Sequence, residues 1–269
     1  MKDFQTLSLA EPAPSVVVVT IEREVSANTI SAQLSRDLIG VCEHLASGDA
    51  FGAVVITGRG RFFCAGADLR DPERNDPGWL DLGRQALDAI ADLPVATIAA
   101  INGTGVGGGT ELALACDIRF AAQSAKLGLP EIKIGALPGA GGLSRLQHLV
   151  GPSKARDLLF TGRLISSDEA LAIGLVDRVL PADEVLSAAT AHASEIGQYA
   201  TYAVRTAKRV LNESLGQPAG MALQNEYRQV DRMATPEQLA VEQRRAADRD
   251  PAYARIFGQA TDGNSRGAA

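Results

Sequence analysis

The segment VATIAAINGTGVGGGTELALACDIRFAAQ, residues 95–123, decides the fold class of this chain. Residues 95–101 have the continuous apolar pattern of a buried strand, and a cluster of glycines follows at once. Residues 109–117 have the composition of a short helix, and 118–123 again have a strand pattern. A strand, a glycine turn, a helix and another strand in so short a stretch predict a layered α/β core.

The same alternation of strand and helix patterns continues on both sides of this segment. Ser166 and Glu169 have capping-box spacing, which predicts that a helix begins there. From about residue 184 the pattern is almost wholly helical. We therefore expect an α/β core over residues 1–200 and a helical C-terminal region over 201–269. Further strands are predicted at 16–22 and 52–58, and further helices at 33–47, 81–93 and 151–162.

The composition excludes several classes of protein. The chain has 269 residues and a net charge of −6, with no basic patch of the kind that nucleic-acid binding needs. Cys42, Cys64 and Cys116 have no metal-ligand spacing and suit a reducing compartment. No apolar run approaches the ~20 residues of a membrane span, and the N-terminus has no apolar signal core. We expect a soluble cytoplasmic protein without nucleic-acid or membrane partners, and without a metal or nicotinamide cofactor.

The glycines at 103, 105 and 108 have the G-x-G-x-x-G spacing of dinucleotide-binding proteins. That fold also needs an acidic residue at the end of the next strand, and here that strand ends in Ala-Gln-Ser. A second explanation is that N–H groups at the start of a helix are aimed at an oxygen of a ligand. A third is a turn that only lets a strand and a helix pack closely. The residues alone disfavour the first and leave the other two open.

Glu111 and Glu131 each lie beside a glycine-rich stretch, 101–117 and 127–142. Two carboxylates together with exposed backbone amides can add or remove water, or a proton, next to a carbonyl group. Glu111 could instead complement the dipole of the helix that it begins, and Glu131 could be solvated. The two residues by themselves do not decide between these interpretations.

Four segments of the chain carry a family pattern: FFCAGADL (62–69), INGTGVGGGTELALACDIRFA (101–121), LGLPEIKIGALPGAGGLSRL (127–146) and GLVDRVLP (174–181). Together they resemble the crotonase superfamily, also called the enoyl-CoA hydratase/isomerase family. They occur in the family's order and spacing, so the resemblance covers roughly residues 15 to 200. It implies a spiral of ββα units with a helical C-terminal extension that serves oligomerisation and covers the site. It also implies a homotrimer or a dimer of trimers.

The resemblance implies an acyl-CoA site with an oxyanion hole. The two amides that would polarise the thioester carbonyl are those of Ala67 and Gly108. The turn from Ala65 to Leu69 resembles the family segment that meets coenzyme A, so Ala65, Asp68 and Leu69 are candidate substrate-binding residues. Asp68 is also expected to fix this turn through side-chain-to-backbone hydrogen bonds. Coenzyme A would be part of the substrate, so no separate cofactor is expected.

Glu111 and Glu131 fall on the two acid/base positions of the family's hydratases. Isomerisation of a double bond can use one carboxylate, whereas hydration needs one group to take a proton from water and another to deliver one to C2. Because both positions are filled, the resemblance favours an enoyl-CoA hydratase, a lyase, with Glu111 helping to activate water and Glu131 donating the proton. Enoyl-CoA isomerisation, another enolate reaction of the family and a non-catalytic acyl-CoA-binding protein are the alternatives.

The other candidates are weaker, and two regions depart from the family pattern. Cys64 fills a position that is commonly small in the family, so a structural role is favoured over a nucleophile. Trp79, in a Pro- and Gly-rich loop, either lines the acyl pocket or has an ordinary packing role, and the sequence leaves both open. Glu24 stands where the family has proline. The C-terminal segment is atypical. No histidine neighbours a serine or cysteine in a nucleophile-like setting. The candidates for binding the coenzyme A phosphates are Arg244, Arg245 and Arg255.

Overall fold

The computed structural model describes residues 4–48, 50–250, 252, 253 and 255. The chain forms two compact units, of which the first ends at Gln198 and the second begins at Tyr199. The first unit holds both sheets and the predicted residues from Ala65 to Glu131, whereas Arg244, Arg245 and Arg255 belong to the second unit.

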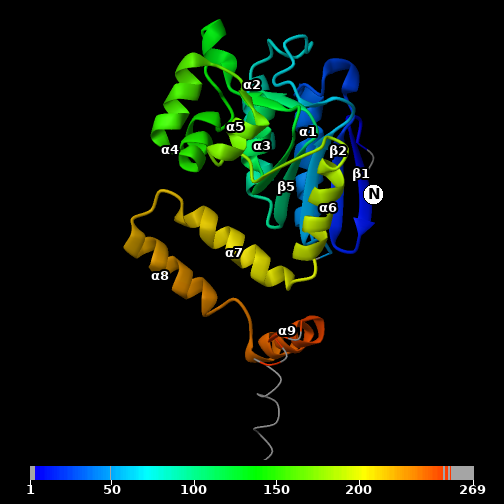
Figure 1. The fold of residues 1–269 in the computed structure, drawn as a ribbon, viewed down its shortest axis with the longest axis vertical. Coiled ribbons are helices and arrows are strands. Elements are labelled where there is room, and N and C mark those ends of the chain that lie inside the picture. Colours follow the sequence, from blue (N-terminus) through cyan, green and yellow to red (C-terminus); the bar gives the residue numbers. More distant parts are fainter. Residues whose placement is uncertain (1–3, 49, 251, 254, 256–269) are drawn as a thin grey trace, which may run out of the picture. The chain divides into compact units, whose positions relative to one another are not determined.

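A six-stranded sheet forms the core of the first unit (Figure 1). Its strands follow the order β1-β2-β3-β5-β7-β10; β1 pairs with β2 antiparallel and the other neighbours are parallel. All residues of β3 and β5 are buried, which explains their continuous apolar sequences. The strands are β1 (Leu7–Ala13), β2 (Val16–Ile21), β3 (Ala53–Gly58), β5 (Ala96–Ile101), β7 (Ile118–Ala122) and β10 (Arg178–Leu180).

A second sheet is small and consists of β4 (Phe62–Cys64), β6 (Thr104–Val106), β8 (Lys126–Gly128) and β9 (Ile165–Ser166). Within it, β4, β6 and β8 are parallel neighbours, and β9 is antiparallel to β8. The carboxyl ends of β4, β6 and β8 therefore lie at the same edge. In open α/β sheets this edge is where ligands usually bind.

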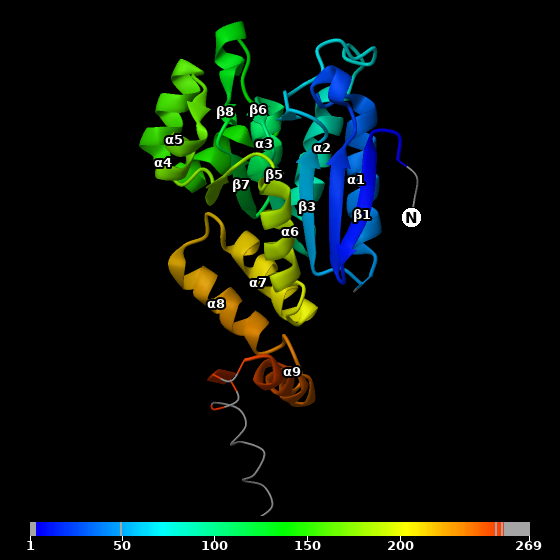
Figure 2. The same ribbon diagram turned by 45° about the vertical axis from the view of Figure 1, so that its right-hand side comes forward.

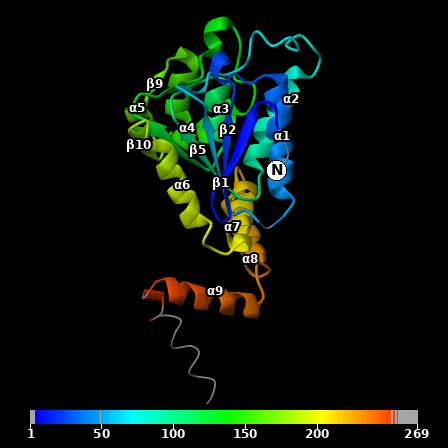
Figure 3. The same ribbon diagram turned by 90° about the vertical axis from the view of Figure 1, so that its right-hand side faces the viewer.

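The helices complete a repeated ββα pattern. A strand of the large sheet is followed by a strand of the small sheet and then by a helix: β3–β4–α2, β5–β6–α3, and β7–β8 followed by η2 and α4. Figure 3 shows α6 on one side of the large sheet and α1 and α2 on the other, and Figure 2 shows the strands between them. This is the predicted α/β spiral. The helices are α1 (Ala32–Ala46), α2 (Trp79–Ala91), α3 (Gly108–Ala115), α4 (Gly142–Thr161), α5 (Ser167–Ala172) and α6 (Val185–Ile196), with 3₁₀ turns η1 (Glu24–Ser26) and η2 (Pro130–Ile134).

The second unit is helical in its described part, as predicted. It contains α7 (Thr201–Ser214), α8 (Ala219–Val230) and α9 (Pro236–Arg249), and α7 packs against α8. A capping box begins α9, in which Thr235 and Gln238 each accept a hydrogen bond from the other's backbone. None of the helices in the described ranges is long and apolar enough to cross a membrane.

The structure corrects several sequence-based boundaries. Strand β1 was not predicted, because its exposed, alternating sequence carries little apolar signal. Helix α4 begins at Gly142, not at 151, and is interrupted at Gly151, where φ is 78°. The Gly151–Pro152 pair hid the first half of this helix, since glycine and proline usually mark an end. Trp79 is not in a loop but is the first residue of α2.

Candidate active site

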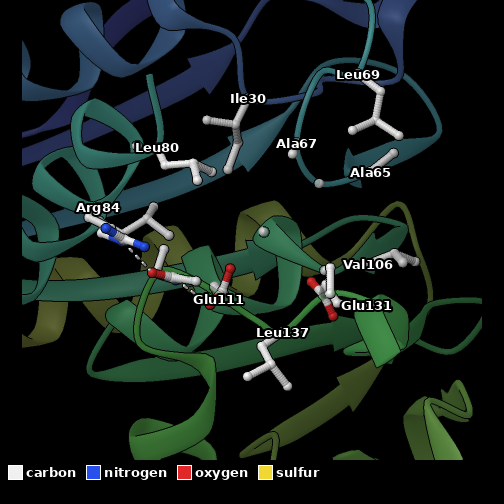
Figure 4. A pocket seen from close by; sticks show the side chains of 18 of the residues that line it. Ile30, Ala65, Ala67, Leu69, Leu80, Arg84, Val106, Glu111, Glu131 and Leu137 are labelled. Carbon is white, nitrogen blue, oxygen red and sulfur yellow. Dashed lines mark hydrogen bonds between the residues drawn. The ribbon is translucent and has the colours of Figure 1, made fainter. Parts of the chain in front are cut away.

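The segments that follow β4, β6 and β8 line one cavity of about 810 Å³ (Figure 4). Each of the three supplies residues that the sequence predicts: Ala65, Ala67 and Leu69 after β4, Gly108 and Glu111 after β6, and Glu131 after β8. The rest of the lining is largely apolar, which lowers the local dielectric and strengthens every charge effect in the cavity. The apolar side chains include Ile30, Leu80, Leu87, Val106, Ile134 and Leu137. Trp79 also lines the cavity, which was one of the two roles that the sequence left open for it.

The turn after β4 is held against the segment before α1. The N–H of Ile30 donates to the carbonyl of Gly66 at 2.7 Å, and the N–H of Asp68 donates to the carbonyl of Ile30 at 2.9 Å. Gly66 has φ +93°, and a Cβ there would lie 2.6 Å from the carbonyl oxygen of Val106. Only glycine fits this position, so the turn lies directly against the start of the segment after β6.

Two backbone N–H groups, those of Ala67 and Gly108, lie close together at this contact. A Cβ built on Gly108 would be 3.5 Å from the nitrogen of Ala67. Gly108 is the first residue of α3, so its N–H has no acceptor within the helix. The N–H of Ala67 has no acceptor among the described residues. The pair, with the positive end of the helix dipole beside it, can bind a developing negative oxygen.

Asp68 holds the turn from outside the cavity, and it is not among the residues that line it. One carboxylate oxygen accepts from the Arg70 N–H at 3.1 Å, which confirms the expected side-chain-to-backbone bond. The other forms an ion pair with Arg23 at 2.8 Å, and the two side chains are only 12% and 20% exposed. Burial acts to raise the pKa of Asp68, but the bonds from Arg23 and Arg70 together outweigh it and lower this pKa.

We expect Asp68→Asn to lower the free energy of unfolding by about 1.5–3 kcal/mol at pH 7, because it removes a charge-assisted bond from a nearly buried arginine. Since the pKa of Asp68 is lowered in the folded protein, its contribution is present above the unfolded pKa of about 3.9 and is lost as pH falls through the folded value. Urea unfolding at pH 7 and pH 3 measures this. The difference between wild type and variant should shrink at pH 3, and a constant difference would contradict the ion-pair explanation. Asp183→Asn, at an exposed aspartate, is the control.

Glu111 is 4% exposed and points from α3 into the cavity. Its Oε1 accepts two backbone hydrogen bonds, from Ala140 at 2.7 Å and from Gly142 at 2.9 Å. Burial raises the pKa of Glu111, and these two N–H groups and the charges of Arg145 and Arg84 oppose the rise. A Cβ on Gly142 would lie 2.9 Å from Oε1, so glycine is required for this approach. Two amides of the 127–142 stretch, those of Ala140 and Gly142, therefore bind Glu111.

Glu131 follows β8 on η2 and lines the same cavity. Its Oε1 lies over Gly107, where a Cβ would approach to 2.7 Å and where φ is 55°. Its Oε2 is buried and has no hydrogen-bond partner among the described residues. Burial raises the pKa of Glu131 and the nearby charge of Glu111 adds to this, while its own backbone N–H opposes it. A buried oxygen without a donor disfavours the ionised form.

The environments of the two glutamates thus differ in kind. Glu111 receives two donors at one oxygen and keeps the other oxygen for the cavity, whereas Glu131 has a buried oxygen without one. The dipole-only and solvated interpretations do not fit, because Glu111 is bound to the 139–142 loop and Glu131 is partly buried. Pairs of carboxyl groups with such unequal surroundings commonly divide acid and base roles.

The remaining candidates lie elsewhere or act structurally. Cys64 is buried, and burial raises the pKa of its thiol to about 12, which excludes a reactive thiolate. Trp79 donates from Nε1 to Asp71 at 2.9 Å, which fixes its ring at the start of α2. Among the described residues no three His, Cys, Asp or Glu side chains are grouped to hold a metal ion. The histidines His44, His148 and His192 do not line the cavity.

Comparison with known proteins agrees with this geometry. The family model described as enoyl-CoA hydratase/isomerase matches residues 11–246. The chain belongs to this family.

Individual relatives cover most of the chain. A probable enoyl-CoA hydratase of Mycobacterium bovis is 39% identical over 215 residues, 78% of this chain and 82% of the relative. Mouse mitochondrial methylglutaconyl-CoA hydratase is 38% identical over 222 residues, 79% of this chain and 71% of that protein. The crystal structure of an enoyl-CoA hydratase from Bacillus anthracis superposes with a TM-score of 0.84 at 36% identity, covering 88% of this chain and 94% of that one.

Proposed function

We propose that this protein is an enoyl-CoA hydratase, a hydro-lyase that reversibly adds water to a 2-enoyl-CoA thioester. The observation that carries the proposal is the pair of unequal carboxyl groups, Glu111 and Glu131, in one cavity with two unpaired amides. The names of the relatives support the same reaction.

In the proposed mechanism the N–H groups of Ala67 and Gly108 bind the thioester carbonyl oxygen and stabilise the enolate. One such donor typically contributes ~3–4 kcal/mol in the transition state. Binding the carbonyl draws electron density from C3, so that water can attack there. Apolar side chains around the cavity favour the fatty-acyl part of a substrate and exclude bulk water.

Glu111, ionised and oriented by two backbone bonds, accepts a proton from the water that adds to C3. Glu131, protonated at rest, delivers its proton to C2 and so discharges the enolate. The addition leaves Glu111 protonated and Glu131 ionised, so one proton returns from Glu111 to Glu131 before the next turnover. Hydration needs one carboxyl group to accept a proton and another to donate one, whereas isomerisation can use a single group. Because the cavity holds two, we propose hydration in preference to isomerisation.

The test follows loss of the conjugated enoyl-thioester absorbance of crotonyl-CoA with wild type and with the double variant Glu111→Gln/Glu131→Gln. We expect wild type to form the 3-hydroxyacyl-CoA and the double variant to be inactive. Products with a moved double bond from longer enoyl-CoA substrates would establish an isomerase instead. A wild-type protein that binds acyl-CoA but shows no activity would support a non-catalytic binding protein.

Fatty-acid metabolism, a cytoplasmic location, assembly as a homotrimer or a dimer of trimers, and the independence from any cofactor belong to the same proposal. So do contacts of Ala65 and Leu69 with the substrate, and the role of the helical region in assembly and in covering the site. Asp68 does not line the cavity, so it is proposed to hold this turn and not to contact the substrate. Arg244, Arg245 and Arg255 remain candidates for the coenzyme A phosphates.

A further inference from the structure

Two arginines, Arg84 on α2 and Arg145 on α4, hold the loop that binds Glu111. Figure 4 shows Arg84 beside the cavity. Nε of Arg84 donates to the carbonyl of Gly139 at 2.8 Å. Nη1 of Arg145 donates to the carbonyl of Ala140 at 2.9 Å. Both contacts are made to backbone, at consecutive carbonyls of one short loop.

Three consecutive peptide groups of this loop connect the two arginines to Glu111. The first carries the Gly139 carbonyl, bound by Arg84, and the Ala140 N–H, which donates to Glu111. The second carries the Ala140 carbonyl, bound by Arg145. The third carries the Gly142 N–H, the other donor to Glu111. The Ala140 donor belongs to the peptide group that Arg84 holds, and the Gly142 donor belongs to the peptide group directly after the one that Arg145 holds.

Each guanidinium is itself anchored by α2. Nη1 of Arg84 pairs with Asp81 at 2.6 Å, and Nη2 of Arg145 pairs with Asp88 at 2.7 Å. Asp81 and Asp88 are seven residues apart, about two helical turns, so they lie on one face of α2. The loop is therefore held between α2 and α4, and both of these helices pack against α3.

A direct role for Arg84 in binding an anionic substrate group is the competing explanation, because this residue also lines the cavity. A guanidinium binds a carboxylate best through two adjacent N–H groups. Arg84 could offer either Nε with Nη2 or Nη1 with Nη2. Its Nε already donates to Gly139 and its Nη1 already donates to Asp81. Neither pair is free, so the contacts favour a role on the loop.

We propose that Arg84 and Arg145 are positioning residues, which set the orientation and the charge state of Glu111 through the Gly139–Gly142 loop. This rests on the proposed function for its kinetic consequence, but not for its geometry. A cation bonded to a peptide carbonyl polarises that peptide and strengthens the bond from its N–H. Arg84 acts in this way on the peptide that carries the Ala140 N–H, whereas Arg145 holds the next peptide in place. Both arginines also act on Glu111 through their direct charge.

The other charged groups near Glu111 do not replace this effect. Glu131 opposes ionisation of Glu111, and Asp81 and Asp88 reduce the net charge of the arginine pairs. The charged groups that face the site are Glu131 from η2, Asp81, Arg84 and Asp88 from α2, Arg145 from α4, and Arg74 and Lys133, which line the cavity.

The test compares Arg84→Gln, Arg145→Gln and the conservative Arg84→Lys with the control Arg36→Gln. Arg36 is also a half-exposed helical arginine in an ion pair, with Glu73, but it does not contact the loop. We expect both loop variants to lower kcat for crotonyl-CoA about ten- to a hundred-fold with KM roughly unchanged, because a small displacement of the base is costly. Arg84→Lys keeps the charge but cannot bind Gly139 and Asp81 together, so it should restore only part of kcat.

A second readout does not depend on activity. The titration of the Glu111 carboxyl group can be followed by carbon-13 NMR, with Glu111→Gln to assign the signal. It should move to higher pH in both loop variants, because each variant removes one of the two positive charges that oppose the rise of this pKa. The acid limb of the pH–rate profile should move the same way. If wild type proves inactive on enoyl-CoA, the proposed function fails and this titration still tests the positioning role. Loop variants that match Arg36→Gln in both the titration and kcat would overturn the inference.

Discussion

Replacing Glu131 by glutamine is expected to abolish most of the hydration activity, lowering kcat by about 10²–10⁴-fold, while leaving the protein folded. Glutamine has the same shape as the protonated carboxyl group that we assign to Glu131 at rest, but it has no acidic proton for C2. Because Oε2 is buried without a partner among the described residues, the neutral amide is accommodated at least as well as an ionised carboxylate.

Stability supplies a readout that separates this loss from misfolding. Burial raises the pKa of Glu131 in the folded protein, so ionising it lowers stability as pH rises above the unfolded value of about 4.3. Glu131→Gln removes that loss. We therefore expect its melting temperature to equal or exceed that of wild type at pH 7 and above, and the gain to vanish below pH 4.

Glu111→Gln is the matched comparison. The amide oxygen can keep both bonds from Ala140 and Gly142, so the geometry of the loop is preserved while the base is lost. Hydration requires both carboxyl groups, so the activity of each single variant in the crotonyl-CoA assay should be several orders of magnitude below that of wild type. Near-normal activity in either one would show that a single carboxyl group suffices, as isomerisation allows.

The sequence was sufficient for the long elements of the fold because their apolar patterns are continuous. Strands β2, β3 and β5 and helices α1 and α2 lie within a few residues of the predicted ranges. The small sheet was not predicted. Its strands β4, β6 and β8 have three residues each, too few for alternation to be seen, and they lie inside glycine-rich segments. The sheet edge that carries the site therefore left no periodic signal.

The site residues were accessible to sequence analysis only through the family resemblance. Gly103–Gly109 alone allowed a nucleotide, an oxyanion or a plain packing turn. What the sequence missed are the supports: Arg23 beside Asp68, and Arg84 and Arg145 on the loop of Glu111. Arg23 and Arg84 lie tens of residues from Asp68 and Gly139, so no local pattern could reveal these contacts. Arg145 is close in sequence to Ala140, but nothing in that segment shows that the loop binds Glu111.

The last prediction concerns the oxyanion hole and uses the position of Gly108. Gly108 is the first residue of α3, where proline is tolerated because the N–H at that position has no acceptor in the helix. Gly108→Pro therefore removes one proposed donor while keeping the helix. The residue before it is Gly107, which can adapt more easily than any other to the restriction that proline imposes.

Gly108→Ala is the control, since it adds a Cβ at the same place but keeps the N–H. That Cβ would lie 3.2 Å from Cδ1 of Ile30, a contact that a small movement of this side chain relieves. We expect Gly108→Pro to lower kcat for crotonyl-CoA by about 10²–10³-fold and Gly108→Ala by much less. Circular dichroism and calorimetric binding of a saturated acyl-CoA report whether the fold and the site survive. Equal losses in the two variants would assign the effect to crowding by the added Cβ, which would lie 3.2 Å from Cδ1 of Ile30 and 3.5 Å from the nitrogen of Ala67. A loss confined to proline, with the fold and acyl-CoA binding retained, would support the loss of the N–H donor.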